Sequence, residues 1–442
     1  MKLSLRYLLA IASIILTSSF PLYGQCPSAA ITTARAQSGS NYNLNHIATE
    51  FKNPHSDLAL ITAHRGYWEY CPESTIEGFQ AAIDYGIEEV EMDVRVSAPG
   101  SDSNGKSYPN GEIFLTHDWD LRGEAPGPLG VQADNNLYTL KPSQIESRTM
   151  VDRHGIASID SAGEAVTMHS FTDLLTSYVA RAKAQSGAIQ ASGGNVCGNT
   201  DGDAALLVRG AFLILDVKGG EKDWNNPVYG TPIPGMVGQY DTMQEAFREL
   251  GAFECQNNID LSLSIAFKLS GNRMPTTAAE FQTDVNTNLV GGINDPYLIL
   301  IVFDNDIAKS GYTAMLQDYR AHYGAYLGGD WQLTFPGNTL EPYVESERAA
   351  GYGVAGFQGN SAYPEGYRNS DATCLQSEDP LPPNPTPCNS QPLAWYASSS
   401  IDFLIPPPSL GISRMSAITT DNFKAALLYL NTIGMHNTTH IQ

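Results

Sequence analysis

The sequence predicts an α/β protein, a (β/α)8 TIM barrel with long loop insertions. Three observations support this prediction. Short apolar runs alternate along the chain with segments of helical periodicity, and this alternation is typical of a parallel sheet. Eight candidate strands follow residue 57, which is the number that a closed barrel of this type needs. Charged and imidazole side chains directly follow several of the apolar runs, as expected at the mouth of such a barrel.

The bulk composition fits one large folded domain. The chain has 442 residues, of which 42% are hydrophobic and 16% charged, so it can bury a sizeable core. The net charge is -22, and this acidity repels the phosphate backbone of nucleic acids. We therefore expect no nucleic-acid partner.

The first 25 residues read as a secretory signal peptide. Lys2 and Arg6 form a short basic region, an apolar run covers residues 8–16, and small polar residues follow up to residue 24. This order is typical of export signals, and the apolar run is too short to span a bilayer comfortably. We expect a secreted or periplasmic protein with no integral membrane segment after cleavage.

After the signal, the sequence divides into two parts. Residues 26–57 are rich in Ser, Thr, Asn and Ala and predict an irregular lead-in, and residues 58–442 predict a single barrel domain. The chain has six cysteines, and an exported protein permits disulfides among them. Six cysteines allow 15 pairings. A local bridge between Cys374 and Cys388 is the favoured single pair, and free buried cysteines are the alternative.

The elements follow in order along the barrel. The first apolar run ends at Ala63 and predicts a buried parallel strand. Residues 74–85 repeat apolar side chains at helical spacing and are closed by Gly86. Residues 89–94 alternate with period two, as a strand does. The eight predicted strands are 58–63, 89–94, 113–116, 211–217, 261–267, 297–303, 353–357 and 415–419. Further helices are predicted at 171–184, 341–350 and 422–430, and long insertions at 98–110, 185–203, 219–240 and 359–400.

Three acidic residues on these strands predict a metal site. Glu91 and Asp93 are two apart on one strand, so their side chains leave on the same face. Two carboxylates in one place repel each other unless a cation neutralises them, and Asp216 could supply a third. Oxygen ligands suit Mg²⁺ or Ca²⁺, so we expect one divalent cation. The alternative is a solvated strand end with unrelated acids.

Two histidines stand where apolar strands end. His64 and His117 each directly follow such a run. Acid/base catalysis of a cleavage needs one proton removed from the attacking group and one given to the leaving group, and two imidazoles suit those roles. Each histidine alone could be a hydrogen-bonded interior residue, but their pairing beside acids favours a functional site.

Two cations occur at the same strand ends. Arg65 and Lys218 could hold phosphate oxygens and stabilise developing charge. The alternative is pairing with the neighbouring acids, and both roles are compatible.

Four spaced motifs together resemble the glycerophosphodiester phosphodiesterase family. They are His64-Arg65-Gly66, Pro72-Glu73-Ser74-Thr75, Glu91-Met92-Asp93-Val94 and His117-Asp118. The resemblance is specific over residues 58–150 and returns at 211–218, with a faint echo at 418–421.

The resemblance implies a role for each matching position. It implies that His64 and His117 are the catalytic acid/base pair. It also implies metal binding by the acids of the third motif and phosphate contacts by Arg65 and Lys218. Glu73 would support the site by orienting the first histidine or helping at the metal. The alternative for Glu73 is an acid favoured by the positive end of a helix.

Departures from the family pattern bear on the substrate. Asp216-Val217-Lys218 stands where the family usually has Glu-x-Lys, and this ending is similar to the related phospholipase D toxins of the sphingomyelinase D type. Ser74 replaces the usual Asn. The usual aromatic motif is missing from residues 353–357.

Two tryptophans flank the histidine motifs. Trp68 and Trp119 could form a substrate wall that holds a choline headgroup by cation–π contact or an acyl chain by burial. Core packing is the equal alternative.

The expected partner is a small-molecule or lipid phosphodiester. The leading function is metal-dependent hydrolysis of a glycerophosphodiester, such as glycerophosphocholine, to glycerol phosphate and an alcohol. The second is a phospholipase D or sphingomyelinase D-like lipase acting on lysophospholipids or sphingolipids. The third is a non-catalytic barrel that binds phosphate or a lipid headgroup.

Overall fold

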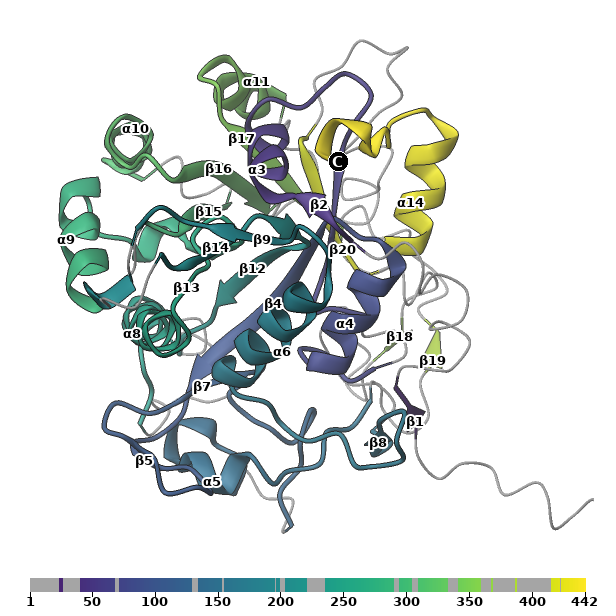
Figure 1. Ribbon diagram of the computed structural model, residues 1–442, viewed down its shortest axis with the longest axis vertical. Helices are drawn as coiled ribbons and strands as arrows, with labels where there is room; N and C mark the ends of the chain where they lie inside the picture. Colours follow the sequence, from purple (N-terminus) through teal and green to yellow (C-terminus); the bar gives the residue numbers. More distant parts are fainter. Residues whose placement is uncertain are drawn as a thin grey trace, which may run out of the picture.

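The computed structural model, shown in Figure 1, describes most of the chain. The described residues are 24–26, 40–67, 71–128, 134–152, 155–194, 196–198, 203–220, 235–289, 294–303, 309–332, 341–358, 367–368, 386–387, 415–421 and 423–442.

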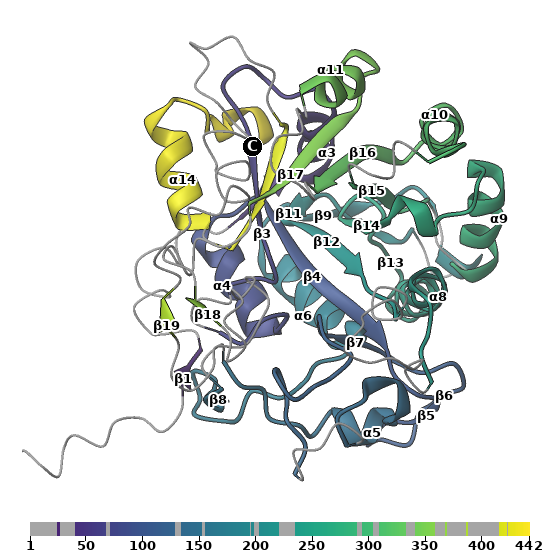
Figure 2. The same ribbon diagram turned by 180° about the vertical axis from the view of Figure 1, so that it is seen from behind.

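Eight parallel strands close into a barrel at the centre of the molecule (Figures 1 and 2). They are β3 (Leu60–Ala63), β4 (Glu89–Val96), β12 (Phe212–Val217), β14 (Ile265–Ser270), β15 (Tyr297–Phe303), β16 (Tyr326–Gln332), β17 (Gly353–Gln358) and β20 (Ala417–Thr420). Each strand pairs in parallel with the next, β20 pairs with β3, and β12 pairs with β4. The predicted (β/α)8 barrel is therefore confirmed.

One predicted barrel strand was wrong. Residues 113–116 form β7 (Ile113–Leu115), which pairs antiparallel with β4 and lies outside the ring. The reason is that β4 continues past the barrel. Its residues up to Val94 pair with β12, while Val94–Val96 pair with β7. The strand that carries Asp216 is consequently the third of the barrel and a direct neighbour of β4.

One barrel strand was missed, and one was misplaced by a few residues. β16 contains Gly328 and Gly329, and glycine weakens the sequence signal of a strand. The run predicted at 261–267 begins its barrel strand only at Ile265. A turn precedes it, in which the N–H of Ser264 donates to the carbonyl of Leu261.

Helices cover the outside of the barrel (Figures 1 and 2). They are α4 (Ile76–Tyr85), α6 (Phe171–Ala184), α8 (Gln239–Asn257), α9 (Ala278–Asn288), α10 (Tyr312–His322), α11 (Glu341–Ala349) and α14 (Phe423–Thr432). The hydroxyl of Thr75 caps α4, and Gly86 ends it with φ 89°, as helix caps favour. Within the described part of the chain, no helix is both long enough and apolar enough to cross a bilayer.

The lead-in is not irregular throughout, which corrects that expectation. It contains α3 (Leu44–Lys52), whose apolar side chains recur at helical spacing behind an Asn43 cap. Phe51 of this helix is buried. It lies against Gly353 of β17, where a Cβ atom would come within 2.0 Å of the Phe51 carbonyl oxygen. The helix therefore packs on the barrel.

The described residues between β4 and α6, within 97–170, form an insert that projects below the barrel in Figure 1. Its elements are β5 (Gly100–Ser101), β6 (Ser107–Tyr108), β7, η2 (Leu137–Thr139), α5 (Pro142–Ile145) and β8 (Ser158–Ile159). Its buried apolar residues form a cluster of their own, which includes Phe114, Leu121 and Met150. The insert thus has a small core beside that of the barrel.

Short elements complete the described structure. They are β1 (Gly24–Gln25), β2 (Tyr42–Asn43), β9 (Ile189–Ala191), η3 (Val196–Gly198), β10 (Ala205–Leu207), β11 (Arg209–Gly210), β13 (Ile259–Asp260), η4 (Gly271–Arg273), β18 (Tyr367–Arg368), β19 (Thr386–Pro387) and η6 (Thr438–Ile441).

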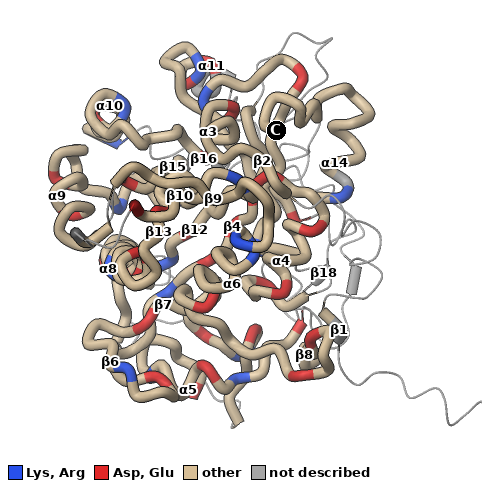
Figure 3. Tube along the Cα trace, viewed as in Figure 1, with Lys and Arg blue, Asp and Glu red and all other residues tan. Residues whose placement is uncertain are grey.

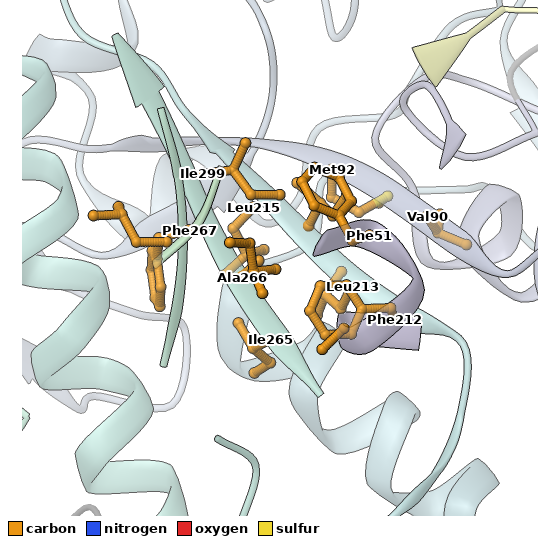
Figure 4. Close-up of a cluster of buried hydrophobic side chains, with 14 of the residues drawn as sticks. Phe51, Val90, Met92, Phe212, Leu213, Leu215, Ile265, Ala266, Phe267 and Ile299 are labelled. Atoms are coloured by element: carbon orange, nitrogen blue, oxygen red, sulfur yellow. The ribbon is translucent and has the colours of Figure 1, made fainter. Parts of the chain in front are cut away.

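The main core surrounds the barrel strands. Figure 4 shows part of it, in which Phe212 and Leu213 of β12 lie close to Ile265 and Ala266 of the neighbouring strand β14. These residues are at most 1% exposed. At roughly 25 cal/mol per Å² of buried apolar surface, such packing supplies most of the driving force for folding.

Two disulfides join described residues, Cys26–Cys71 and Cys197–Cys255. Among the described cysteines none is free. The predicted pair Cys374 and Cys388 lies outside the described residues. Asp and Glu residues are spread along the chain over the barrel helices and the insert (Figure 3), so the acidic residues are not confined to one segment.

Candidate active site

Three carboxylates meet at the carboxyl ends of β4 and β12. Asp216 is the register partner of Asp93, and Glu91 precedes Asp93 by two residues on the same face of β4. One oxygen of each carboxylate lies within 4.8 Å of the other two, and all three side chains are buried. The pairing of β12 directly with β4 brings these acids together.

Lys218 and Arg65 neutralise part of this charge. The Lys218 Nζ lies 3.1 Å from Asp93 Oδ1 and 2.9 Å from Asp216 Oδ2. The Arg65 Nε lies 2.9 Å from Asp93 Oδ2. Burial opposes ionisation of Asp93, but the two cations outweigh it and lower the pKa of this carboxyl. The pairing expected as the alternative for these cations is thus present.

A further lysine, Lys268 on β14, contacts these carboxylates and was missed from the sequence. Its Nζ is 2.5 Å from Glu91 Oε2, 3.4 Å from Asp216 Oδ2 and 3.0 Å from Asp330 Oδ2. Burial raises the pKa of Glu91 to about 7 against the opposing effect of Lys268. Lys268 directly follows the run that was predicted as a strand at 261–267, as His64 follows its own run, and Asp330 lies on the missed strand β16.

His64 is fixed from both sides of its ring. Its Nδ1 lies 2.6 Å from Asp421 Oδ1, and its Nε2 lies 3.8 Å from Glu91 Oε1. Burial and Arg65 oppose the protonated ring, but Asp421 and Glu91 prevail and raise the pKa of His64. Asp421 directly follows the last barrel strand, so the rule that selected His64 would also have selected this acid.

The backbone after His64 makes a tight turn toward the site. Arg65 has φ 55° and Gly66 has φ 77°, and only glycine takes such values at low cost. A Cβ at Gly66 would lie 2.8 Å from the carbonyl carbon of Gly78 on α4. The N–H of Ser74 donates to the carbonyl of Arg65 over 3.0 Å. The turn therefore holds the Arg65 side chain over the carboxylates.

His117 is carried by the insert and not by the barrel. It follows β7, and its Nδ1 lies 2.8 Å from Asp118 Oδ1. One ligand atom of His117 lies within 4.8 Å of the carboxylate oxygens of Glu73 and Glu124, which form a second acidic group. Glu73 Oε2 also accepts a hydrogen bond of 2.7 Å from Arg65. The structure thus groups Glu73 with the second histidine, where the sequence suggested the first.

These contacts connect the two histidines through charged side chains. Glu73 lies beside His117 and binds Arg65, which binds Asp93 of the carboxylate group, and Glu91 of that group faces His64. All eight charged and imidazole site residues predicted from the sequence belong to this network.

The carboxylate group fits a divalent cation. Its donors are all oxygen, they are buried, and they come from two adjacent strands, which suits Mg²⁺ or Ca²⁺. Without a cation, three buried anions would depend on Lys218, Lys268 and Arg65 for all their neutralisation.

Of the two tryptophans that flank the histidine motifs, the structure describes Trp119. Trp119 is 6% exposed and packs with Tyr138, beside Met236 and Val237. This is the packing arrangement that the sequence left as the alternative to a substrate wall. Trp68 lies outside the described residues.

An imidazole, carboxylates and cations at the ends of barrel strands, with a second imidazole on the insert, are groups that a phosphoric diester hydrolase uses. The model of the Glycerophosphoryl diester phosphodiesterase family matches residues 64–101. This range contains the first three of the four motifs. The match confirms, over these residues, the resemblance inferred from the motifs.

Known proteins resemble the chain over most of its length. The uncharacterized protein y4eD of Sinorhizobium fredii is 26% identical over 405 residues, which cover 88% of this chain and 87% of that protein.

Three solved structures are also similar. One from Silicibacter pomeroyi is 12% identical, with a TM-score of 0.49 and coverage of 88% and 99% of the two chains. A glycerophosphoryl diester phosphodiesterase from Parabacteroides distasonis is 13% identical, with a TM-score of 0.42 and coverage of 88% and 94%. An Oleispira antarctica phosphodiesterase, solved with the product sn-glycerol-3-phosphate, is 13% identical, with a TM-score of 0.43 and coverage of 84% and 97%.

Proposed function

We propose that the chain hydrolyses glycerophosphodiesters, such as glycerophosphocholine, to glycerol phosphate and an alcohol, with one divalent cation and with His64 and His117 as acid and base. The observation that carries this proposal is the contact between His64 and Glu91, over 3.8 Å, within the buried carboxylate group. This contact places an imidazole directly beside a site suited to a cation.

Glu91, Asp93 and Asp216 would hold the cation, and Mg²⁺ and Ca²⁺ both suit their oxygens. When bound, the cation supplies Lewis-acid stabilisation of a phosphoryl oxygen. Lys218 and Arg65 already lie against these carboxylates. They would contact the remaining phosphate oxygens and stabilise charge as it develops.

The two imidazoles divide the proton transfers. Asp421 fixes the orientation of the His64 ring, and Asp118 does the same for His117. One ring would take a proton from the attacking oxygen, and the other would give a proton to the leaving alkoxide. The attacking oxygen belongs to water or to a neighbouring hydroxyl of the substrate, and the latter gives a cyclic phosphate first.

A second function has one observation in its favour. Asp216 and Lys218 form a pair with 2.9 Å between charged atoms, at the position where an Asp-x-Lys ending resembles the sphingomyelinase D type. Release of choline from lysophospholipids or sphingolipids would then replace hydrolysis of the water-soluble diester. A non-catalytic barrel that binds a headgroup is the remaining alternative.

Product analysis separates these functions. The purified mature protein is incubated with glycerophosphocholine, lysophosphatidylcholine or sphingomyelin, with and without EDTA, and products are identified by mass spectrometry. Matched variants are His64→Ala and His322→Ala, since His322 is an exposed histidine of α10. We expect EDTA-sensitive glycerol phosphate from glycerophosphocholine, lost in His64→Ala and retained in His322→Ala.

Two other outcomes would overturn the leading function. Choline release confined to the lipids would establish the lipase. No turnover of any substrate, with wild type and His64→Ala alike across several metals, would favour the binding protein.

We also propose that residues 1–25 direct export and are removed. The buried Cys26–Cys71 disulfide supports an oxidising compartment. Mass spectrometry of the exported chain tests this, and an N-terminus near residues 24–26 is the expected result. Retention of Met1 in the exported protein would contradict it.

A further inference from the structure

We propose that Glu124 is a positioning residue that fixes the turn carrying His117, and this inference rests on the proposed role of His117 in proton transfer. Glu124 belongs to the insert, it is 4% exposed, and no sequence motif selected it. Its carboxylate accepts hydrogen bonds from the turn that contains His117.

Both carboxylate oxygens bind this turn. Oε1 accepts from the backbone N–H of His117 over 3.1 Å and from that of Asp118 over 2.9 Å. Oε2 accepts from the hydroxyl of Thr116, which also lies 3.0 Å from the carbonyl oxygen of Asp118. One buried side chain thus ties three consecutive residues together.

The peptide of His117 is held at its other end as well. Its carbonyl accepts a 2.6 Å hydrogen bond from Arg95 Nε, and the same guanidinium donates to the Tyr138 hydroxyl. Glu124 therefore holds the N–H side of His117 while Arg95 holds the carbonyl side. Arg95 lies on β4, and the N–H of Thr116 also donates to the carbonyl of Asp93 over 3.0 Å. These two contacts tie the turn to the barrel, and Glu124 fixes the conformation of the turn itself.

The hydrogen bonds extend to the imidazole itself. Asp118, whose N–H binds Glu124, contacts His117 Nδ1 with its own carboxylate over 2.8 Å. A shift of this turn would move the ring and its partner together. A displacement of about 1 Å by a change outside the reacting groups can cost about 100-fold in rate.

Burial of the Glu124 carboxylate costs free energy of desolvation, which an apolar side chain filling the same space would not. Burial raises the pKa of Glu124 well above its usual range, and Glu73 and Asp118 add to the effect. An apolar side chain would avoid this cost but would leave two backbone N–H groups without their acceptor. The need to position the turn therefore explains why an acid, and not an apolar residue, occupies position 124.

A matched set of variants tests this role. Glu124→Gln keeps one acceptor oxygen, Glu124→Leu removes both, and Thr116→Val removes the hydroxyl contact. Glu254→Gln and Glu254→Leu are the controls. Glu254 is also a buried acid, and it accepts a 2.9 Å bond from the backbone N–H of Leu261, near the start of β14 and away from the strand ends that form the site.

The readouts are kcat and KM for glycerophosphocholine, thermal unfolding, and amide hydrogen exchange of a peptide covering residues 114–120. We expect kcat to fall about 100-fold in Glu124→Leu and about tenfold in Thr116→Val, with KM changed by less than about threefold. Glu124→Gln should recover part of the rate. Exchange at His117 and Asp118 should accelerate in Glu124→Leu but not in the Glu254 variants.

The outcomes separate this inference from the proposed function. If folded Glu124→Gln and Thr116→Val match wild type in kcat and exchange, while His117→Ala is inactive, Glu124 has no positioning role. If His117→Ala itself turns over at the wild-type rate, the proposed function fails, and the exchange measurement still decides whether Glu124 holds the turn. Glu124→Gln and Thr116→Val keep the test available if Glu124→Leu does not fold.

Discussion

Lys268 Nζ on β14 lies 2.5 Å from Glu91 Oε2 on β4, inside the barrel. The same ammonium contacts Asp216 of β12 and Asp330 of β16. One buried cation thus joins acids from three other strands, and two of those acids belong to the proposed metal site. The arrangement makes the stability of the barrel and the geometry of the site depend on the same side chain.

Replacement of this lysine should destabilise the protein strongly. Lys268→Met would leave Glu91 and Asp330 buried without their cation, and removal of one partner of a buried ion pair costs about 3–5 kcal/mol. Urea unfolding measures the free energy. The control Lys183→Met changes an exposed lysine of α6 and should stay within about 0.5 kcal/mol of wild type. A Lys268→Met protein as stable as this control would contradict the interpretation.

Loss of the Asp421 carboxylate should lower both the pKa of His64 and the rate of catalysis. Because Asp421 helps raise the pKa of His64 against the effect of burial, Asp421→Asn should lower that pKa. We expect kcat/KM to fall about 100-fold and the pH dependence assigned to His64 to move to lower pH. NMR titration of the ring and a pH–rate profile check this. Asp57→Asn is the control, since Asp57 contacts the partly exposed His440 over 2.9 Å, and it should leave the profile unchanged.

Divalent cations should stabilise the wild type and not a ligand variant. A cation at 100 times its Kd stabilises the folded state by about 2.7 kcal/mol. Asp93→Asn removes the carboxylate that Arg65 and Lys218 contact. The positive charge of these two side chains should then repel the metal ion. Thermal unfolding with Mg²⁺, Ca²⁺ or EDTA measures the shift. Equal stabilisation of both proteins by the same cation would place the metal elsewhere.

Stability should fall with rising pH through Glu254. Burial raises the pKa of this carboxyl to about 8, although the N–H of Leu261 opposes the shift. The folded protein therefore keeps the proton that the unfolded chain releases above about pH 4.3. This contribution is complete below that pH and is lost as pH rises to about 8.

A glutamine variant isolates this effect. Between pH 5 and 8, the unfolding free energy of Glu254→Gln should improve relative to wild type by roughly 2–4 kcal/mol. Urea unfolding at the two pH values measures the difference. A difference independent of pH would show that the Glu254 carboxyl titrates alike in both states.

The disulfide Cys26–Cys71 should contribute measurably to stability. It closes a separation of 45 residues, for which loop-closure entropy gives about 4 kcal/mol, and measured values are commonly about 2–4 kcal/mol. The double variant Cys26→Ser, Cys71→Ser should lose roughly that amount in urea unfolding. The Cys197–Cys255 pair, with a separation of 58 residues, serves as the comparison. Unchanged stability in the first double variant would indicate that the bridge does not form in solution.

Features that depend only on one strand and the residues directly after it could be predicted from the sequence. A run of apolar residues followed by an ionisable side chain was enough to select His64, and period two was enough to place Glu91 and Asp93 on one face. The same reasoning failed for β7. Its own residues do not indicate that β4 continues beyond the barrel and pairs there with an antiparallel strand. It also failed for β16, where two glycines hide the strand.

Asp421 directly follows a strand and Lys268 directly follows a predicted one, but their partners in the site are distant in sequence and could not be predicted. Asp421 meets His64 across 357 positions, and Lys268 meets Glu91 across 177. Such pairs arise only when the ring of strands closes. Glu124 is close to His117 in sequence, but its role follows from backbone hydrogen bonds within an irregular turn, which no periodic pattern records.

The insert that follows β4 separates the two histidines of the proposed site into different parts of the fold. The barrel pairs β4 with β12 directly, so its closure does not require the insert, yet the insert supplies His117 and has a core of its own. The acids proposed to bind the cation and His64 thus lie on or directly after barrel strands, whereas His117 lies on the insert. A change confined to the insert is therefore expected to alter proton transfer by His117 and to leave the proposed cation ligands in place.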